Sequence, residues 1–237
     1  MKRLTLFSFA IIFAISAANS QTLDEIIKQY SVAIGADNLA SIKTIKATGR
    51  TSTMGMDMPM TAFMKNPNKI RVTTSFMGQE MIMIFDGVNG YMINSMLGSA
   101  QPTELNGEQL RQLQSYNTFN NNLLKFHENK QITFEGTENI NGNPAYKLKI
   151  NVPELLEQPM YIFIDQKTGL PAKATVAVEQ MGTLMNVETF TSDYVNVSGV
   201  VMPKKSTVIM NGMEIMTMLF DQIEVDIPID DSVFTVK

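Results

Sequence analysis

Short segments with a two-residue period are the feature of this sequence that most limits its fold. Each is rich in Thr, Val, Ile, Met and aromatic residues and is bounded by turn signals. The clearest turn signal is Asn211-Gly212, which separates the runs VIM and MEI and is typical of a type I′ hairpin. The pattern predicts antiparallel strands near residues 43–53, 59–66, 69–77, 79–85, 90–94, 130–136, 144–151, 159–165, 171–180, 183–195, 201–210 and 213–226.

Two stretches have helical spacing instead. Apolar residues recur every three or four positions over residues 22–34, which predicts a helix that stops at Gly35, and a shorter helix follows to about residue 42. Residues 106–126 interrupt the strand pattern with two short helices. A sheet this long leaves an apolar interior that needs a cover. We therefore expect a mainly β (α+β) fold, a half-open, incomplete antiparallel β-barrel of about ten to twelve strands covered by short helices.

The first twenty residues have the features of a secretory signal peptide. Lys2 and Arg3 precede an apolar run from Leu4 to about Ala18, and small residues before Gln21 suit a cleavage site. No linker or low-complexity tract divides the remainder, so residues 21–237 are expected to form a single domain. Because no cysteine follows the apolar run, we expect a periplasmic protein that is exported, soluble and not lipid-anchored.

Charge and motif content argue against several functions. The formal net charge is −4 and no basic block is present, so nucleic acid is a poor candidate partner. The chain contains one histidine, His127, and no cysteine, no glycine-rich phosphate loop and none of the common hydrolase motifs. No group of residues suggests catalysis. We therefore predict a protein that is not an enzyme and needs no cofactor or metal.

Methionine is unusually frequent, with 19 residues in the chain. Met54, Met56, Met58, Met60 and Met64 crowd into one short stretch, and further methionines occur in many of the expected strands. Thioether sulfur is a soft ligand that suits Cu(I), but methionine also forms adaptable apolar surfaces. The spread over many strands suits an apolar binding surface as well as it suits gap filling in an ordinary core, and copper binding stays as the weaker alternative.

The stretch MGMDMPM at residues 54–60 also contains turn-forming residues. Gly55, Asp57 and Pro59 predict a hairpin tip, with Met56 and Met58 exposed at its rim. Exposed thioethers at that position would suit the entrance of an apolar cavity.

Two further stretches carry a resemblance to a known family. The sequences MKNPNKIRV at 64–72 and MIFDGVNGYMIN at 83–94 resemble the LolA-type periplasmic carriers of outer-membrane lipoproteins, especially the Bacteroidetes-type outer-membrane lipoprotein-sorting proteins. The positions that fit the family pattern are Lys65, Pro67, Asn68, Asp86, Gly87, Tyr91 and Asn94. The closing IDDSVFTV at 229–236 resembles the family's ending, which implies a final strand containing Phe234.

The resemblance implies a carrier or chaperone that binds acyl chains of lipoproteins, or lipids, in a hydrophobic cavity for transfer to the outer membrane. Its partners would be the acylated cargo and a membrane-bound donor and acceptor, and the protein itself would be a monomer. The same fold could instead serve an envelope sensor or interaction module. Alternation along the strands and helices predicts these cavity residues: Met56, Met58, Met60, Met64, Val72, Phe76, Met81, Met83, Phe85, Leu110, Leu113 and Leu123.

One position departs from the family pattern. In the better-known carriers an arginine just before the Pro-Asn pair hydrogen-bonds the helical lid and helps to hold it shut. Here the lid-latch position is Asn66, which is shorter and uncharged. Arg71 could replace that arginine only if its side of the strand faces the lid.

Overall fold

The computed structural model describes residues 21–95, 98–115, 122–153, 156–180 and 182–236. The expected signal peptide, residues 1–20, lies outside the described residues. Among the helices in the described ranges, none has both the length and the apolar character that crossing a membrane requires.

The chain forms helices at its start, middle and end, and two runs of strands between them. The helices are α1 (Leu23–Ile34), α2 (Ala36–Ser41), α3 (Gly107–Ser115), α4 (Asn122–Glu128) and the 3-10 helix η2 (Asp231–Phe234). The first run of strands is β1 (Thr44–Thr53), β2 (Met56–Lys65), β3 (Lys69–Phe76), β4 (Gln79–Phe85), β5 (Gly90–Asn94) and β6 (Ser99–Leu105). The second run is β7 (Ile132–Ile140), β8 (Asn143–Ile150), β9 (Met160–Asp165), β10 (Pro171–Gln180), β11 (Thr183–Val197), β12 (Val200–Met210) and β13 (Met213–Val225).

Within the described residues, thirteen strands make one antiparallel sheet in the order β6-β5-β4-β3-β2-β1-β13-β12-β11-β10-β9-β8-β7. Every neighbouring pair is sequential except β1 and β13, which join the two runs at the centre of the sheet. The sheet does not close, because β6 and β7 remain as its two edges. The expected mainly β, half-open architecture is confirmed, and β6 is a strand that the sequence pattern does not predict.

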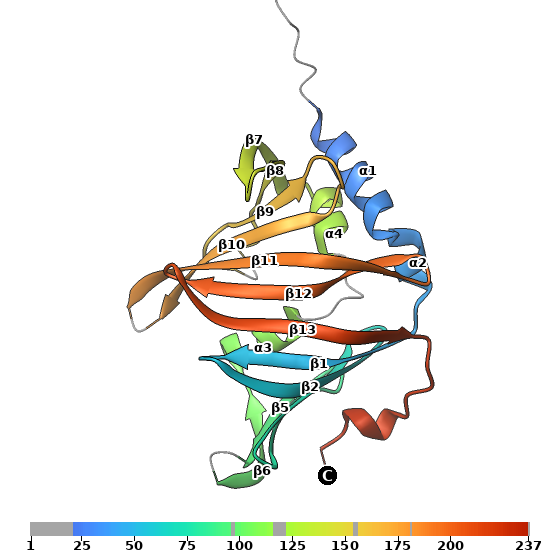
Figure 1. Cartoon of the computed structure of the whole chain (residues 1–237), viewed down its shortest axis with the longest axis vertical. Coiled ribbons are helices and arrows are strands. Elements are labelled where there is room, and N and C mark those ends of the chain that lie inside the picture. The colour runs from blue at the N-terminus through green and yellow to red at the C-terminus, as the bar shows by residue number, and fades with distance from the viewer. Residues whose placement is uncertain (1–20, 96–97, 116–121, 154–155, 181, 237) are drawn as a thin grey trace, which may run out of the picture.

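The first helix is fixed at both ends by local chemistry. The Thr22 hydroxyl accepts a hydrogen bond from the backbone N–H of Glu25, and the Glu25 carboxylate accepts one from the N–H of Thr22, which is a capping box. At the other end Gly35 adopts a left-handed φ of 69°, and a Cβ there would lie 1.9 Å from the carbonyl oxygen of Gly199. Only glycine allows this close approach between α1 and the β11–β12 turn. In Figure 1, α1 and α2 lie beside the ends of the central strands.

One face of the sheet, which we call the helix-side face, carries the main hydrophobic core. At one end of the sheet, Ile26 and Ile27 of α1 and Leu123 of α4 pack against Leu148 and Ile164. At the other end, Leu110 and Leu113 of α3 pack in a cluster with Ile70, Phe85 and Leu105. Figure 1 shows α3 and α4 behind the strands. The helices therefore cover the two ends of one face, and the opposite face, which we call the outer face, carries η2.

The C-terminal segment is a correction to the sequence prediction. Residues 231–234 form the 3-10 helix η2 and not a final strand, although Phe234 is buried as expected for a closing aromatic residue. Arg71 Nη1 donates a 3.1 Å hydrogen bond to the Val233 carbonyl, and Lys65 and Lys69 pair with Asp231 at 2.8 Å and 3.2 Å. These contacts hold η2 against β2 and β3.

The turn predicted around MGMDMPM is also different. The turn consists of Met54 and Gly55 alone, both with positive φ, and β2 begins at Met56. Pro59 lies within β2 opposite Arg50 of β1. The β2–β3 pairing ends at Met60, so the missing N–H of Pro59 removes no bond from that ladder. The predicted hairpin is correct, but its tip is two residues long, and Met58 is half-buried where the prediction has it exposed.

Candidate functional site

The central strands present a methionine-rich surface on the helix-side face. Residues directly opposite each other on antiparallel strands share a face. Thr51 lies opposite both Met58 and Met218, and Val208 lies opposite Met216. Following the register from β2 to β10 gives one surface, which we call the Met surface: Met56, Met58, Met60, Met216, Met218, Phe220, Val208, Met210, Met185, Val187, Val176 and Val178.

This surface lies between the two helix-covered ends of the sheet. Met60 is buried and Met56 is exposed, and the other side chains of the Met surface are half-buried. The same strands have a charged outer face, where Arg50 pairs with Asp57 and Asp221, and Lys46 pairs with Glu224. The centre of the sheet is therefore apolar on one side and charged on the other.

The predicted cavity residues of the strands all lie on the helix-side face. Val72 lies opposite Ala62 and Met83, Met81 lies opposite Thr74, and Phe85 lies opposite Ile70, which places them on the face of Met60 and Met64. Phe76 shares this face by alternation along β3. Their role in binding stays a prediction.

The three predicted helical residues divide between the two ends. Leu110 and Leu113 belong to the cluster around Phe85 under α3, whereas Leu123 lies in the cluster under α1 and α4. Phe85, Leu113 and Leu123 are buried by these contacts. They would touch a ligand only after movement of a covering helix.

Sequence reasoning missed the part of the Met surface that comes from β10 to β13. Met216 and Met218 are two residues apart and Met185 belongs to the same alternation as Val187, which is the strand signal that places them on one face. Their proximity to Met58 depends on the pairing of β1 with β13, which no local pattern reveals.

One buried side-chain oxygen on this face has no hydrogen-bond partner among the described residues. Thr51 is buried, and its Oγ1 makes no hydrogen bond there. Thr51 lies between Met58 and Met218 in the register. A buried hydroxyl without a partner costs free energy, so this atom is a candidate donor to a ligand oxygen.

The hydrogen bonds of Asn66 and Arg71 go to parts of the molecule other than α3 and α4. Asn66 Nδ2 donates a 3.1 Å hydrogen bond to the carbonyl of Ile42, between α2 and β1. Arg71 lies opposite Ile84 on the outer face and contacts Val233. Asn66 therefore ties the β2–β3 turn to the N-terminal connection, and Arg71 ties β3 to η2.

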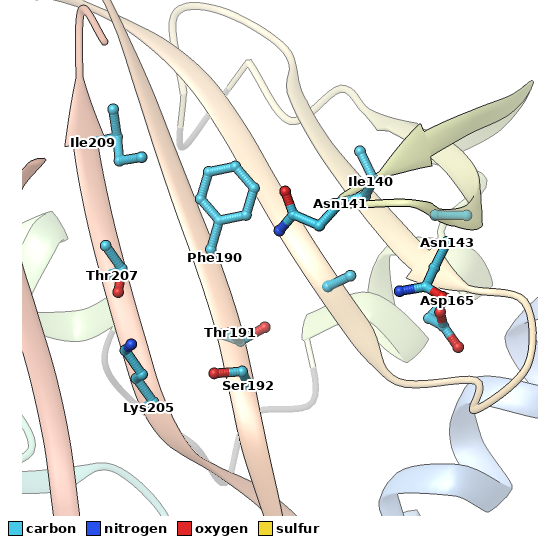
Figure 2. A pocket seen from close by; sticks show the side chains of 12 residues that line it. Ile140, Asn141, Asn143, Asp165, Phe190, Thr191, Ser192, Lys205, Thr207 and Ile209 are labelled. Atoms are coloured by element: carbon cyan, nitrogen blue, oxygen red, sulfur yellow. The ribbon is translucent and has the colours of Figure 1, made fainter. Parts of the chain in front are cut away.

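The outer face contains a separate hollow of about 440 Å³. Figure 2 shows its lining, which comes from the β7–β8 hairpin and from β9 to β12: Ile140, Asn141, Asn143, Ala145, Asp165, Ala172, Phe190, Thr191, Ser192, Lys205, Thr207 and Ile209. Two lysines lie over aromatic rings beside it. The ammonium group of Lys147 is 5.0 Å from the centroid of the Tyr161 ring, and that of Lys173 is 5.2 Å from the centroid of the Phe190 ring. Amides, hydroxyls and a lysine make this hollow less suited to an acyl chain than the Met surface.

The titratable side chains of His127, Tyr30 and Tyr194 lie in different surroundings. His127 Nε2 lies 2.8 Å from Asp24 at the surface. Burial raises the pKa of Tyr30, and it raises the pKa of Tyr194 to about 12, so both phenols stay protonated at neutral pH. No group of three His, Cys, Asp or Glu side chains in the described ranges could hold a metal ion.

The methionines of β2 do not form a metal cage along their strand. Met56, Met58 and Met60 alternate along a regular strand, which separates successive members by about 6.8 Å. This backbone spacing does not by itself bring three sulfurs to one ion, so the copper alternative gains no support from this segment.

Comparisons with known proteins show a likeness in structure and none in sequence. No protein-family model and no curated protein matches the sequence. A DUF1329 family protein from Desulfovibrio piger superposes with a TM-score of 0.60 at 11% identity, covering 89% of this chain and 97% of the other. A putative outer membrane lipoprotein-sorting protein domain from Vibrio parahaemolyticus superposes with a TM-score of 0.59 at 10% identity, covering 89% and 94%.

A LolA superfamily protein from Nitrosomonas europaea completes the comparison. It superposes with a TM-score of 0.54 at 14% identity, covering 92% of this chain and 99% of its own. Nearly the whole length of each of these proteins is matched. The chain has a LolA-like fold.

Proposed function

We propose that this protein is a periplasmic carrier that binds the acyl chains of lipoproteins, or of lipids, against the Met surface. The observation that supports this most directly is the contrast between the two faces of the central strands. Half-buried methionine and valine side chains occupy one face, and ion pairs occupy the other. A lipoprotein-sorting role in a protein of the same fold is consistent with the proposal.

The driving force would be the removal of methylene groups from water. Six strands from β2 to β10 give the Met surface a width of about 24 Å, at roughly 4.8 Å per strand spacing. Burial of about ten methylenes would contribute roughly 8 kcal/mol before the costs of association. Flexible methionine side chains can fit acyl chains of different length or branching, which suits a carrier with several cargoes.

Movement of α3 would extend the surface. Phe85 of β4 is buried against Leu113 of this helix, in a cluster that also includes Val72 and Met83. If the helix shifts when cargo enters, the strand side chains Phe85, Val72 and Met83 exchange contacts with α3 for contacts with the acyl chain. Under this proposal α3 is a cover, and the role of the predicted residues Leu110 and Leu113 is to hold the cover closed without cargo.

The polar groups of a lipid would require few protein partners. Thr51 Oγ1 could donate a hydrogen bond to an ester or amide oxygen within the otherwise apolar surface. The protein itself would catalyse no reaction, and export would depend on the signal peptide expected in residues 1–20.

The experiment that tests the proposal has two parts. Protein purified from its native envelope without detergent is extracted with organic solvent, and the extract is analysed for acyl lipids by mass spectrometry. In parallel, the cargo-free protein is titrated with a synthetic peptide that carries S-diacylglyceryl-cysteine, and with the same peptide without acyl chains. We expect lipid in the extract and binding of the acylated peptide alone. Absence of lipid together with equal binding of the two peptides would reject the carrier function.

A further inference from the structure

Four hairpins of the central sheet turn at the same end of the strands and expose a large apolar side chain there. The sheet order places the β3–β4, β1–β2, β12–β13 and β10–β11 hairpins side by side. The exposed fractions are 89% for Met77, 90% for Met54, 70% for Met213 and 59% for Leu184. We call these four residues the tip row. The turns of the β1–β2 and β12–β13 hairpins lie on the left-hand side of Figure 1.

The turn conformation makes these side chains unusual. Met54-Gly55, Met77-Gly78 and Asn211-Gly212 all have positive φ at both positions, which is the geometry of a type I′ turn. Asn, Asp and Gly are preferred at the first position, as in Asn211-Gly212. Met54 and Met77 have φ of 52° and 50° and lack that preference. The positive φ costs stability at both methionines, and their exposed side chains gain none from burial, so a contact made outside the chain is the simplest reason for them.

Each of three tips also carries a carboxylate in the same place. Asp57, Glu80 and Glu214 each follow the turn glycine by two residues, and all three are exposed. No lysine or arginine occurs within three positions of these glycines. Arg50 of β1 pairs with Asp57 and offsets its charge, and Glu80 and Glu214 keep the charge of the row negative. An anionic lipid surface would be repelled, and a basic partner would be attracted.

The spacing of the tips indicates the shape of that partner. Neighbouring hairpins are two strands apart, which is about 10 Å. Seven residues of an α-helix rise about 10.5 Å, so a helix with one apolar face can present a side chain to each tip in turn. We propose that the tip row is a docking surface for a basic amphipathic helix of a partner protein. None of its four residues belongs to the Met surface, which it adjoins where Met213 lies opposite Met210, and its test does not depend on acyl binding.

The test uses three variants of the protein and two peptides. The probe is a labelled 21-residue peptide with leucine at the a and d positions of each heptad and lysine at the other positions. The control peptide has glutamate in place of every lysine. Fluorescence anisotropy of the wild-type protein should show binding of the lysine peptide. The variant M54S/M77S/M213S should bind it about tenfold more weakly, because three apolar contacts are lost. Acylated-peptide binding should be unchanged in this variant.

The matched control removes apolar surface from the opposite end of the molecule. Val32 and Val88 are 75% and 76% exposed, in α1 and in the β4–β5 turn, and V32S/V88S should bind the lysine peptide like the wild type. A second variant, E80K/E214K, should weaken binding of the lysine peptide and strengthen binding of the glutamate peptide. Equal far-UV spectra and thermal midpoints establish that the variants are folded.

Two results would overturn the proposal. One is binding of the lysine peptide by M54S/M77S/M213S with the affinity of the wild type. The other is co-flotation of the wild type, but not of this variant, with phosphatidylcholine vesicles while both bind the peptide equally, which would assign the tip row to a bilayer surface.

Discussion

Met58 of β2 and Met218 of β13 lie opposite the same residue, Thr51, and so face the same side of the sheet from the two halves of the chain. Both are half-buried. They mark the middle of the Met surface, where a bound acyl chain would cross the junction between the two runs of strands. Their positions make them the most direct test of the proposed binding surface.

Replacing both with serine should weaken binding of the acylated peptide. Two adaptable apolar contacts would be lost, and at about 1 kcal/mol each the dissociation constant should rise by tenfold or more. Isothermal titration of M58S/M218S against the wild type measures the change. The control is Leu219→Ser, because Leu219 is also half-buried but lies opposite Arg50 on the outer face. Equal weakening by both variants would contradict the assignment of the helix-side face.

Thr51→Val should stabilise the cargo-free protein. Valine keeps the shape of the side chain and removes the buried hydroxyl that has no partner, so the free energy of unfolding should rise by about 1 kcal/mol. Urea denaturation measures this. Thr44→Val is the matched control on the same strand: Thr44 Oγ1 donates a 2.7 Å hydrogen bond to the Ile227 carbonyl, and its loss should destabilise the protein by a similar amount. A destabilised T51V variant would mean that the hydroxyl has a partner in solution.

Gly35→Ala should destabilise the fold more than Gly55→Ala. Both glycines have a positive φ, but an added Cβ at Gly35 would meet the Gly199 carbonyl, whereas none of the described residues lies within 4 Å of that position at Gly55. The strain at Gly55 should cost about 1 kcal/mol, and Gly35 should lose roughly 2 kcal/mol or more because α1 must also move. Urea denaturation of the two variants gives the comparison, and equal losses would show that the contact with Gly199 is not tight.

Docking of η2 should depend on pH through Asp231. Hydrogen bonds from Lys65 and Lys69 hold the pKa of Asp231 below its usual value of 3.8. A lowered pKa in the folded state means that the contact stabilises η2 above about pH 4 and is lost as the pH falls through the folded value. The amide shifts of Val233 and Phe234, followed by NMR from pH 6 to pH 2, should report this release.

The matched variant for this titration is Asp231→Asn. Asp230 also has a lowered pKa because of its bonds to Ser232, so a smaller titration should remain in D231N. The component that follows the Lys65 and Lys69 contacts should disappear. An unchanged titration curve would assign the effect to Asp230 instead.

Local alternation predicts the positions of most strands. It also predicts which side chains of β2 to β4 lie together on one face of the sheet. Val72, Met81 and Met83 fall on the helix-side face as the two-residue period predicts, because consecutive strands joined by short turns pair in register. β6 was missed because an edge strand with exposed residues, including Pro102, has no apolar alternation to detect. Local sequence also misassigned MGMDMPM, since Pro59 is tolerated where the β2–β3 ladder has ended.

The rest of the candidate site depends on contacts between distant residues. Nothing near Met218 in the sequence indicates that it shares a face with Met58, because this follows from the β1–β13 pairing. Asn66 is a similar case. Its bond to the Ile42 carbonyl could not be predicted from the family-like Pro-Asn segment, which suggested a contact with a lid. η2 likewise forms because Lys65, Lys69 and Arg71 of β2 and β3 bind the end of the chain.

The β1–β13 pairing also determines when the sheet can be completed. β1 is among the first strands to be synthesised and β13 is the last, so one edge of β1 has no partner until nearly the whole chain is available. A contact of such long sequence separation slows folding and leaves a strand edge exposed in the meantime. A nascent or truncated form without β13 should therefore be prone to aggregate.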